Sequence, residues 1–257
     1  MINAKDSQNT FYILDKKNDV PIVFIHGVGL NHKIWEPQIN VFENTFLAYD
    51  ILGHGKTPLD KENLSFDDFS NQLINLIDEL NIRRIHLVGF SIGSLIARNF
   101  ASKYSDRLES LILLCSIFRR TEKQQQIVKD RFELAKKSKS LSKQALKRWF
   151  TDEYLEKNPN TYNKISSILE QNSMENFLKI YELFVNHKDD EQFEKIKTKT
   201  LIMTGEGDIG STPEMSINLG KVISNSNVKI ISKGKHLCSI ECADDVNMAI
   251  KKHIQND

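Results

Sequence analysis

Cysteine and long apolar runs are both scarce in this sequence of 257 residues. The three cysteines, Cys115, Cys238 and Cys242, are an odd number with no second pair at the spacing of a zinc finger, so we expect reduced thiols and no metal site. No apolar run approaches the roughly 18 residues that span a membrane, and the N-terminus lacks the basic and then apolar order of a secretory signal. These absences favour a cytoplasmic protein that has no membrane segment.

Neither sign of charge is in excess over the whole chain. Lys and Arg number 35 against 34 Asp and Glu, which gives a formal net charge of +1. A dedicated binder of nucleic acid or of an anionic membrane needs a surface dominated by positive charge, so both classes of partner are disfavoured. Small neutral or anionic molecules remain the candidate ligands. The chain is long enough to bury a large core, and one domain with an insertion is the simplest organisation.

Short apolar runs rich in β-branched residues alternate with amphipathic stretches along the chain. Apolar residues recur at helical spacing from Phe66 to Leu80 and again from Ile92 to Phe100, so each segment can pack one face on a sheet. This alternation predicts an α/β fold with a mainly parallel central sheet and helices on both faces. The predicted strands are residues 21–26, 46–51, 85–90, 111–116, 200–205 and 228–232, with a more polar edge strand at 10–14 and a closing helix at 243–254.

The alternation stops between Ile117 and Lys195. This interval has no convincing strand but several amphipathic helical patterns, among them QIVKDRFELAKK, KQALKRWF and NFLKIYELF. A segment of this length is far too long for an ordinary loop. It predicts a helical cap insertion, residues 117–195, over one end of a core formed by residues 1–116 and 196–257.

The stretch LVGFSIGS, residues 87–94, places Ser91 between two glycines, directly after a predicted strand and at the start of a predicted helix. In this context the pattern is typical of a nucleophilic serine on a tight turn, where Gly89 and Gly93 let the two backbones pass closely. The helix N-terminus also supplies free N–H groups near developing negative charge. We therefore predict that Ser91 is a nucleophile rather than an ordinary loop serine.

A serine nucleophile needs a base to take its proton, and the base needs an acid that fixes its tautomer. His236 follows the last predicted strand, and Asp208 follows the strand before it. Because the carboxyl ends of parallel strands meet at one edge of a sheet, we expect both side chains to lie near Ser91. The order serine, acid, histidine is that of an α/β-hydrolase. Glu206 is the rival for the acid.

The oxyanion of an acyl-transfer reaction requires two backbone donors. The N–H of Ile92, the residue after the nucleophile, is the first candidate. The second candidate is the N–H of Val28, in the loop GVGLNHKIW. Gly27 and Gly29 flank it and allow this loop to fold back toward the nucleophile.

The motifs FIHGVGLNHKIW, AYDILGHGKT, LVGFSIGSLIA, TGEGDIGSTPEM and KHLCSIE together resemble the α/β-hydrolase superfamily, in particular small capped serine hydrolases such as 3-oxoadipate enol-lactonases and carboxylesterases. The resemblance covers the whole predicted sheet and is weak in the cap. It implies a catalytic triad of Ser91, Asp208 and His236, with Val28 and Ile92 as oxyanion donors. Dehalogenases and epoxide hydrolases of this fold have an aspartate at the position of the serine, whereas cofactor-independent oxygenases can keep the triad.

The first part of the predicted cap is basic, since residues 119–148 contain eleven Lys or Arg against three Asp or Glu. Such a surface can steer an anionic substrate such as a carboxylated lactone, although lysines on a helix commonly serve only to solvate its outer face. A guanidinium can also bind a carboxylate through two hydrogen bonds. The candidate substrate-binding residues are Arg119, Arg120, Arg148 and Trp149 of the cap and His32 of the oxyanion loop.

These residues lead to the hypothesis of a serine hydrolase that cleaves a carboxylic ester or lactone of a small molecule through an acyl-enzyme, without a metal or an organic cofactor. The same triad serves hydrolysis of a carbon–carbon bond in a ring-cleavage product, and acyl transfer to an acceptor other than water. A non-catalytic small-molecule sensor is the alternative from a different class. The sequence leaves open the natural substrate and the choice between a monomer and a homodimer.

Overall fold

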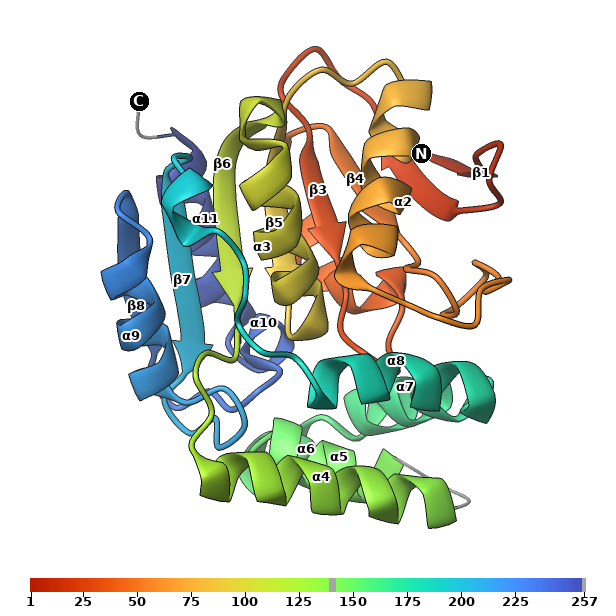
Figure 1. Ribbon diagram of the computed structural model, residues 1–257, viewed down its shortest axis with the longest axis vertical. Helices are drawn as coiled ribbons and strands as arrows, with labels where there is room; N and C mark the ends of the chain where they lie inside the picture. Colours follow the sequence, from red (N-terminus) through yellow and green to blue (C-terminus); the bar gives the residue numbers. More distant parts are fainter. Residues whose placement is uncertain (139–141, 256–257) are drawn as a thin grey trace.

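The computed structural model describes residues 1–138 and 142–255 and has an eight-stranded sheet at its centre (Figure 1). The strands are β1 (Ile2–Lys5), β2 (Phe11–Asp15), β3 (Ile22–Ile25), β4 (Phe46–Tyr49), β5 (Ile85–Phe90), β6 (Leu108–Leu114), β7 (Thr200–Gly205) and β8 (Ser226–Ile231). Their order is β1-β2-β4-β3-β5-β6-β7-β8, and all neighbours from β4 to β8 are parallel. β1 and β2 extend the sheet antiparallel beyond β4. The predicted mainly parallel sheet is confirmed.

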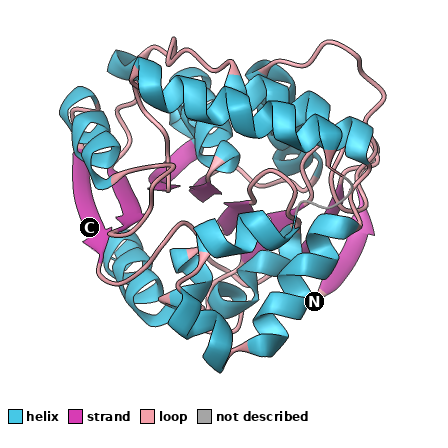
Figure 2. Cartoon of the chain, turned by 90° about the horizontal axis from the view of Figure 1, so that it is seen from below, coloured by secondary structure: helices cyan, strands magenta, loops and turns pink. Residues whose placement is uncertain are grey.

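Helices cover both faces of this sheet (Figure 2). One face is covered by α2 (Phe66–Glu79), α3 (Ile92–Lys103) and α9 (Pro213–Val222), and the other by α1 (Glu36–Ile39) and α11 (Ala243–Gln255). The connections contain η1 (His32–Trp35), η2 (Ser105–Arg107), η3 (Phe193–Lys195) and α10 (Cys238–Glu241). Among the helices of the described ranges, none is long and apolar enough to cross a membrane.

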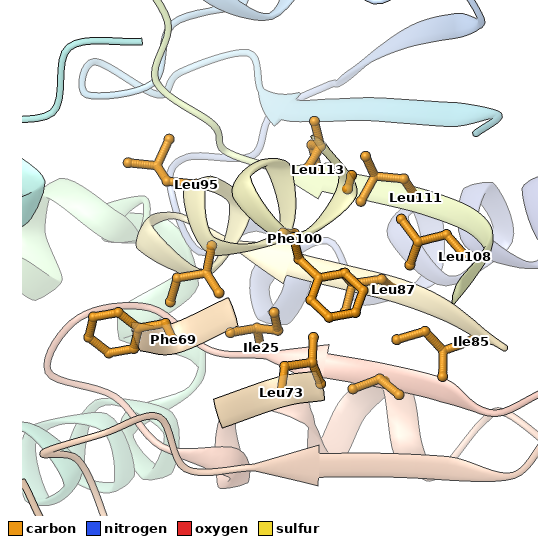
Figure 3. Close-up of a cluster of buried hydrophobic side chains, with 14 of the residues drawn as sticks. Ile25, Phe69, Leu73, Ile85, Leu87, Leu95, Phe100, Leu108, Leu111 and Leu113 are labelled. Atoms are coloured by element: carbon orange, nitrogen blue, oxygen red, sulfur yellow. The ribbon is translucent and has the colours of Figure 1, made fainter. Parts of the chain in front are cut away.

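Successive residues of the parallel strands are buried on opposite faces, which explains why these strands are continuous apolar runs. In β3, Val23 belongs to the cluster under α2 and α3, whereas Phe24 belongs to the cluster under α11. Figure 3 shows the first cluster, where Leu73 of α2 and Phe100 of α3 lie over Leu87 of β5. Helices on both faces therefore hold the carboxyl ends of the central strands in fixed relative positions.

The edge of the sheet differs from the prediction. Residues 10–14 were expected to form the edge strand, but β2 lies one position inside the edge because β1 pairs with it from Ile2 opposite Leu14 to Lys5 opposite Phe11. β1 has the sequence INAK with mostly exposed side chains, so main-chain pairing rather than an apolar pattern defines it. β6 starts earlier than predicted and ends before Cys115, where φ is 53° and the extended backbone stops.

The described residues between β6 and β7 form helices and no strand, which agrees with the predicted insertion. These helices are α4 (Glu122–Lys137), α5 (Ser142–Trp149), α6 (Asp152–Lys157), α7 (Pro159–Glu170) and α8 (Met174–Val185), and we call them the cap. The cap lies across the carboxyl ends of the strands, at the bottom of Figure 1. In open α/β sheets this is the edge at which ligands bind.

Both ends of the cap insertion are fastened to one buried arginine of the core. Arg98 of α3 is 0% exposed, and its Nη1 donates to the carbonyl oxygen of Ile117 at 2.7 Å where the chain leaves the core. Its Nη2 pairs with Asp189 at 2.7 Å and with Glu191 at 2.6 Å where the chain returns. The helix that follows Ser91 thus holds both crossings between core and cap.

Replacing Arg98 by methionine should lower the free energy of unfolding by about 3–5 kcal/mol, because two carboxylates are left buried without their counter-charge. Urea denaturation measures the loss. The matched control Lys103→Met removes an exposed ion pair to Asp67 from the same helix, and should change the free energy by about 1 kcal/mol or less. Equal losses in the two variants would contradict an anchoring role for Arg98.

Candidate active site

Ser91 lies on the tight turn between β5 and α3. Its φ of 55° and ψ of −118° are unusual for a residue with a side chain and are the geometry of a strained strand-to-helix elbow. Its N–H donates to the carbonyl of Leu114 at 2.9 Å, which holds the turn at the edge of the sheet. A Cβ on Gly93 would lie 2.4 Å from the carbonyl oxygen of Ile25, so only glycine lets α3 approach β3 this closely.

Three side chains from separate strand ends form one hydrogen-bonded chain. The Oγ of Ser91 lies 3.2 Å from Nε2 of His236, and Nδ1 of the same ring lies 2.6 Å from Oδ2 of Asp208. An ionised carboxylate only accepts hydrogen bonds, so Nδ1 carries a proton, and in the neutral ring Nε2 accepts from the serine hydroxyl. The structure thus brings together the three residues that were predicted as a triad.

The surroundings of Asp208 and His236 favour the charged form of both groups. Burial opposes the charge of Asp208, but the charge and hydrogen bond of His236 and the N–H groups of Ser211 and Gly210, at 3.0 and 2.8 Å, lower the pKa of this carboxyl. Burial opposes the charge of the imidazole too, but the carboxylate raises the pKa of His236 above its ordinary 6.5. The pair is therefore arranged to stabilise an imidazolium.

Glu206, the rival for the acid, is exposed and makes other contacts. Its Oε2 accepts from the hydroxyl of Ser232 at 3.3 Å and from the N–H of Lys233 at 3.1 Å. These bonds hold the carboxylate of Glu206, which follows β7, against the loop that follows β8. Asp208 is therefore the acid that contacts the histidine.

The loop that carries His236 is bonded to the cap. The N–H of Leu237 donates to the carbonyl of Trp149 at 3.0 Å. Glu241 accepts from the N–H of Thr151 at 2.9 Å through one oxygen and from the N–H of Lys235 at 3.1 Å through the other. Glu241 belongs to α10 and joins cap to core. The position of the histidine thus depends on the cap.

The two predicted oxyanion donors, Val28 and Ile92, lie in the loop after β3 and at the first position of α3. A Cβ on Gly27 would lie 3.4 Å from Cβ of Ser91, so the loop after β3 runs beside the nucleophile. Within the described ranges, the N–H groups of Val28 and Ile92 donate to no protein acceptor. Neither N–H group is therefore spent on a bond within the described chain.

Two buried histidines hold this loop in place. The N–H of Gly29 donates to Nε2 of His54 at 2.7 Å, and the N–H of Ile51 donates to Nε2 of His26 at 3.1 Å. In His26, Nδ1 donates to the carbonyl of Gly27 at 2.8 Å. Burial lowers the pKa of His26 to about 4 and that of His54 to about 3, so both rings are neutral acceptors at pH 7. Bonds of this kind leave no trace in a sequence pattern, because the partners are backbone groups.

A pocket of about 470 Å³ opens over these groups, within the size range of small-molecule sites. On the core side it is lined by Val28, Ser91, Asp208, Ile209, Gly210, Ser211 and His236. The cap contributes mainly apolar side chains, including those of Val128, Ala135, Trp149, Leu169, Phe177 and Phe184, together with the basic residues Arg120, Arg131, Lys137 and Arg148. The pocket therefore offers an apolar wall with a local positive charge.

Three of the five predicted substrate-binding residues line this pocket, namely Arg120, Arg148 and Trp149. His32 does not, because its Nδ1 bonds Oδ1 of the buried Asp50 at 2.7 Å. Arg119 does not either: its side chain is exposed and lies 4.8 Å from the centre of the Phe118 ring. The backbone turns at Arg119, where φ is 48°, and sends the two neighbouring arginines in different directions. Neither His32 nor Arg119 thus lies in the lining of this pocket.

Arg131 and Tyr181 also line the pocket and were missed by the sequence reasoning. A signal for Arg131 was available. It lies three residues after Val128 and four before Ala135, and residues at that spacing share one face of a helix. Both neighbours are buried, so this spacing places Arg131 on the inner face of α4.

Two groups of side chains in the described part of the chain have the spacing of metal ligands. They are Cys115 with Asp208 and His236, and His187 with Asp189 and Glu191. In the first group, burial raises the pKa of the Cys115 thiol, and its Sγ donates to the carbonyl of His236 at 3.0 Å. In the second group, the guanidinium of Arg98 already supplies the positive charge. Each group thus already has ligand atoms engaged within the chain.

Comparison with known proteins agrees with this fold. Residues 20–242 match the family described as the alpha/beta hydrolase fold. The (E)-2-((N-methylformamido)methylene)succinate hydrolase of Acinetobacter baylyi is 26% identical over 97% of this chain and 95% of the relative. The 3-oxoadipate enol-lactonase 2 of the same organism is 22% identical over 97% of this chain and 94% of the relative. The crystal structure of the enol-lactonase from Burkholderia xenovorans LB400 has the same fold, with a TM-score of 0.83 and 23% identity over 96% of this chain and 97% of that one.

The neutral histidines under the oxyanion loop predict an acid-labile fold. Their folded pKa values lie below the unfolded value near 6.5, so the stabilisation is complete above pH 6.5 and is lost as the pH falls toward 4 and 3. The variant His54→Gln keeps an acceptor that does not titrate. Its free energy of unfolding, measured in urea from pH 8 to pH 4, should fall by about 3 kcal/mol less than that of the wild type. Identical pH dependence in both proteins would contradict a neutral buried His54.

Proposed function

The chain belongs to the α/β-hydrolase family, and on that premise we propose that it is a serine hydrolase that cleaves a carboxylic ester or lactone of a small molecule. The observation that carries the proposal is the hydrogen-bonded chain from Ser91 through His236 to Asp208, at the core side of a pocket of small-molecule size. Relatives named as a hydrolase of a succinate derivative and as an enol-lactonase are consistent with such a substrate.

In the first half of the reaction the acyl group moves to the enzyme. His236 takes the proton of the Ser91 hydroxyl through Nε2 while Oγ attacks the carbonyl carbon of the substrate. Asp208 holds the ring in the required tautomer and stabilises the imidazolium. The N–H groups of Val28 and Ile92 stabilise the oxyanion of the tetrahedral intermediate. The imidazolium then gives its proton to the departing alkoxide, and the acyl group remains on the serine.

In the second half a water molecule releases the acid. His236 takes a proton from the water as its oxygen attacks the acyl carbon, and the same two N–H groups stabilise the second oxyanion. The imidazolium returns the proton to Oγ of Ser91 as the ester bond breaks. These steps use only groups of the chain, the substrate and water.

We assign the two parts of the chain different duties within this proposal. Residues 1–116 and 196–257 form the catalytic core, and residues 117–195 form a lid that selects the substrate. The three cysteines are unpaired thiols, which fits a reducing compartment such as the cytoplasm. The described chain carries all the groups that the proposed reaction uses, namely Ser91, Asp208, His236 and the two N–H donors. A monomer can therefore carry out the reaction, and so can a homodimer.

Replacing Ser91 by alanine should lower the turnover of short-chain esters by about 10⁴-fold or more and abolish labelling by a fluorophosphonate probe. The acyl acceptor is removed, while the fold should persist, as measured by urea denaturation. Ser102→Ala on the same helix is the matched control, because in the described part of the chain this hydroxyl bonds only the carbonyl of Asn99. Turnover or labelling that survives in Ser91→Ala would refute the role of the serine.

The activity should fall as the pH is lowered through a midpoint above 6.5. His236 acts as a base only when it is neutral, and the Asp208 carboxylate raises the pKa of this histidine, so protonation removes the active form. The measurement is kcat/KM on a neutral ester from pH 5 to pH 9. The variant Asp208→Asn should shift the midpoint downward and lower kcat by about 10⁴-fold. A midpoint that is the same in both proteins would mean that Asp208 does not act on the histidine.

Product analysis separates this proposal from the other activities that the same triad allows. Release of an acid and an alcohol in equal amounts supports ester hydrolysis. Release of two fragments from a ring-cleavage product would indicate carbon–carbon bond hydrolysis, and an acylated alcohol or thiol would indicate acyl transfer. A tight small-molecule complex without any turnover would indicate a sensor.

A further inference from the structure

Three arginines and a tyrosine of the cap line the pocket that contains the triad. Arg120 precedes α4, Arg131 lies on α4, Arg148 lies on α5 and Tyr181 lies on α8. We propose that the arginine cluster, Arg120, Arg131 and Arg148, binds a carboxylate of the substrate, so that the enzyme acts on esters or lactones with a free carboxylate remote from the ester carbonyl. This inference rests on the proposed hydrolase function and names its substrate class.

The guanidinium N–H groups of the arginine cluster do not bind carboxylates of the described chain. Within residues 1–138 and 142–255, none of its three guanidiniums forms an ion pair. Nη1 of Arg120 donates to the carbonyls of Phe184 and Val185 at 3.1 and 3.2 Å, while its Nη2 is buried without an acceptor. Nη1 of Arg148 donates to the carbonyl of Gln144 in its own helix at 2.8 Å. Because Nη2 of Arg120 is closed off from the surface, the N–H groups left for a ligand are those of Arg131 and the remaining ones of Arg148.

The positive charges of the cluster destabilise one another. Burial, and then the charge of Arg131, lowers the pKa of Arg148. Burial lowers the pKa of Arg120 to about 10, against the attraction of Asp189 and Tyr181 and with a contribution from Arg131. At this pKa the Arg120 guanidinium stays protonated at neutral pH. Like charges held together in a partly buried site are stabilised when an anion binds among them.

Two acidic side chains of the cap insertion, those of Asp189 and Glu133, pair with other residues. Asp189, which attracts Arg120, pairs with the buried Arg98 at 2.7 Å. Glu133, on the same helix as Arg131, pairs with Lys136 at 2.7 Å. The aspartate of the triad is the one acidic residue among the described lining residues, and it is bonded to the histidine of the triad. The positive charge of the cluster is thus left for a ligand.

The remaining lining defines the shape of the ligand. Apart from the cluster and Lys137, the cap lines the pocket mainly with apolar side chains such as Val128, Leu169 and Phe177. A molecule that fits has an apolar body, a carbonyl at Ser91 and one anionic group. Planar guanidiniums bind the two oxygens of a carboxylate through paired hydrogen bonds, and the hydroxyl of Tyr181 is a further donor. An ester or lactone with a carboxylate at its far end meets these requirements.

The test compares paired esters that differ in one charge. Monoethyl succinate, glutarate and adipate carry a free carboxylate, and the matched compounds carry a carboxamide in its place. The wild type should prefer the carboxylate by about tenfold or more in kcat/KM for at least one chain length, because charge-assisted hydrogen bonds are the stronger ones. The preference should shrink as salt is added. In the double variant R131Q/R148Q the ratio should fall to about one.

Arg119→Gln is the matched control, because this arginine is exposed and does not line the pocket. Its ratio of carboxylate to carboxamide hydrolysis should equal that of the wild type. A wild-type ratio near one, or a ratio that R131Q/R148Q leaves unchanged, would overturn the inference. Hydrolysis of the carboxamide esters in that case would leave the proposed hydrolase function standing.

A binding measurement tests the inference even if the enzyme hydrolyses neither the carboxylate esters nor the carboxamide esters. In the Ser91→Ala protein, glutarate at low ionic strength should raise the melting temperature above the value in sodium chloride of equal ionic strength. The same addition should have no effect when R131Q and R148Q are also present. The triple variant is expected to fold, because two mutually repelling charges have been removed. No stabilisation by glutarate, or stabilisation by inorganic phosphate alone, would overturn a carboxylate site.

Discussion

The hydrogen bond between Asp208 and Nδ1 of His236 is the interaction on which the rest of the site depends. At 2.6 Å it fixes the ring so that Nε2 faces the hydroxyl of Ser91 at 3.2 Å. The bond forms because β7 and β8 are parallel neighbours, so the loops that follow them start at the same edge of the sheet. The strained elbow brings the third member to that edge from β5. A sheet with two covered faces is thus what holds three residues distant in sequence within bonding distance.

The cap shares in this arrangement rather than lying loosely over it. Arg98 ties both of its crossings to the helix after the nucleophile, and the carbonyl of Trp149 accepts from the N–H next to His236. The same segments present the arginine cluster to the pocket. In this account the core determines the reaction and the cap determines which acyl compound reaches the serine. A movement of the cap would change both the position of the base and the site for the anion.

The sequence was sufficient where local pattern and structure coincide. Ser91, Asp208 and His236 follow buried strands, so the topology of a parallel sheet brings them together without knowledge of any contact. The sequence was insufficient where the structure of a segment or side chain depends on a partner elsewhere in the chain. β1 has no apolar pattern and exists only through pairing with β2, and the partner of His32 is a carboxylate eighteen positions away, Asp50. Arg119 and Arg120 are neighbours in sequence, yet a single backbone turn separates their directions.

The central claim is that the reaction passes through an acyl group on Ser91. The most direct measurement is intact-mass and peptide-mass spectrometry of the protein quenched within the first turnover of 4-nitrophenyl acetate, where formation of the acyl-enzyme is expected to outrun its hydrolysis. The account predicts an acetyl adduct on the peptide that contains Ser91, formed in step with a burst of nitrophenol and lost as turnover ends. Steady turnover without an adduct, or an adduct on another residue, would contradict it.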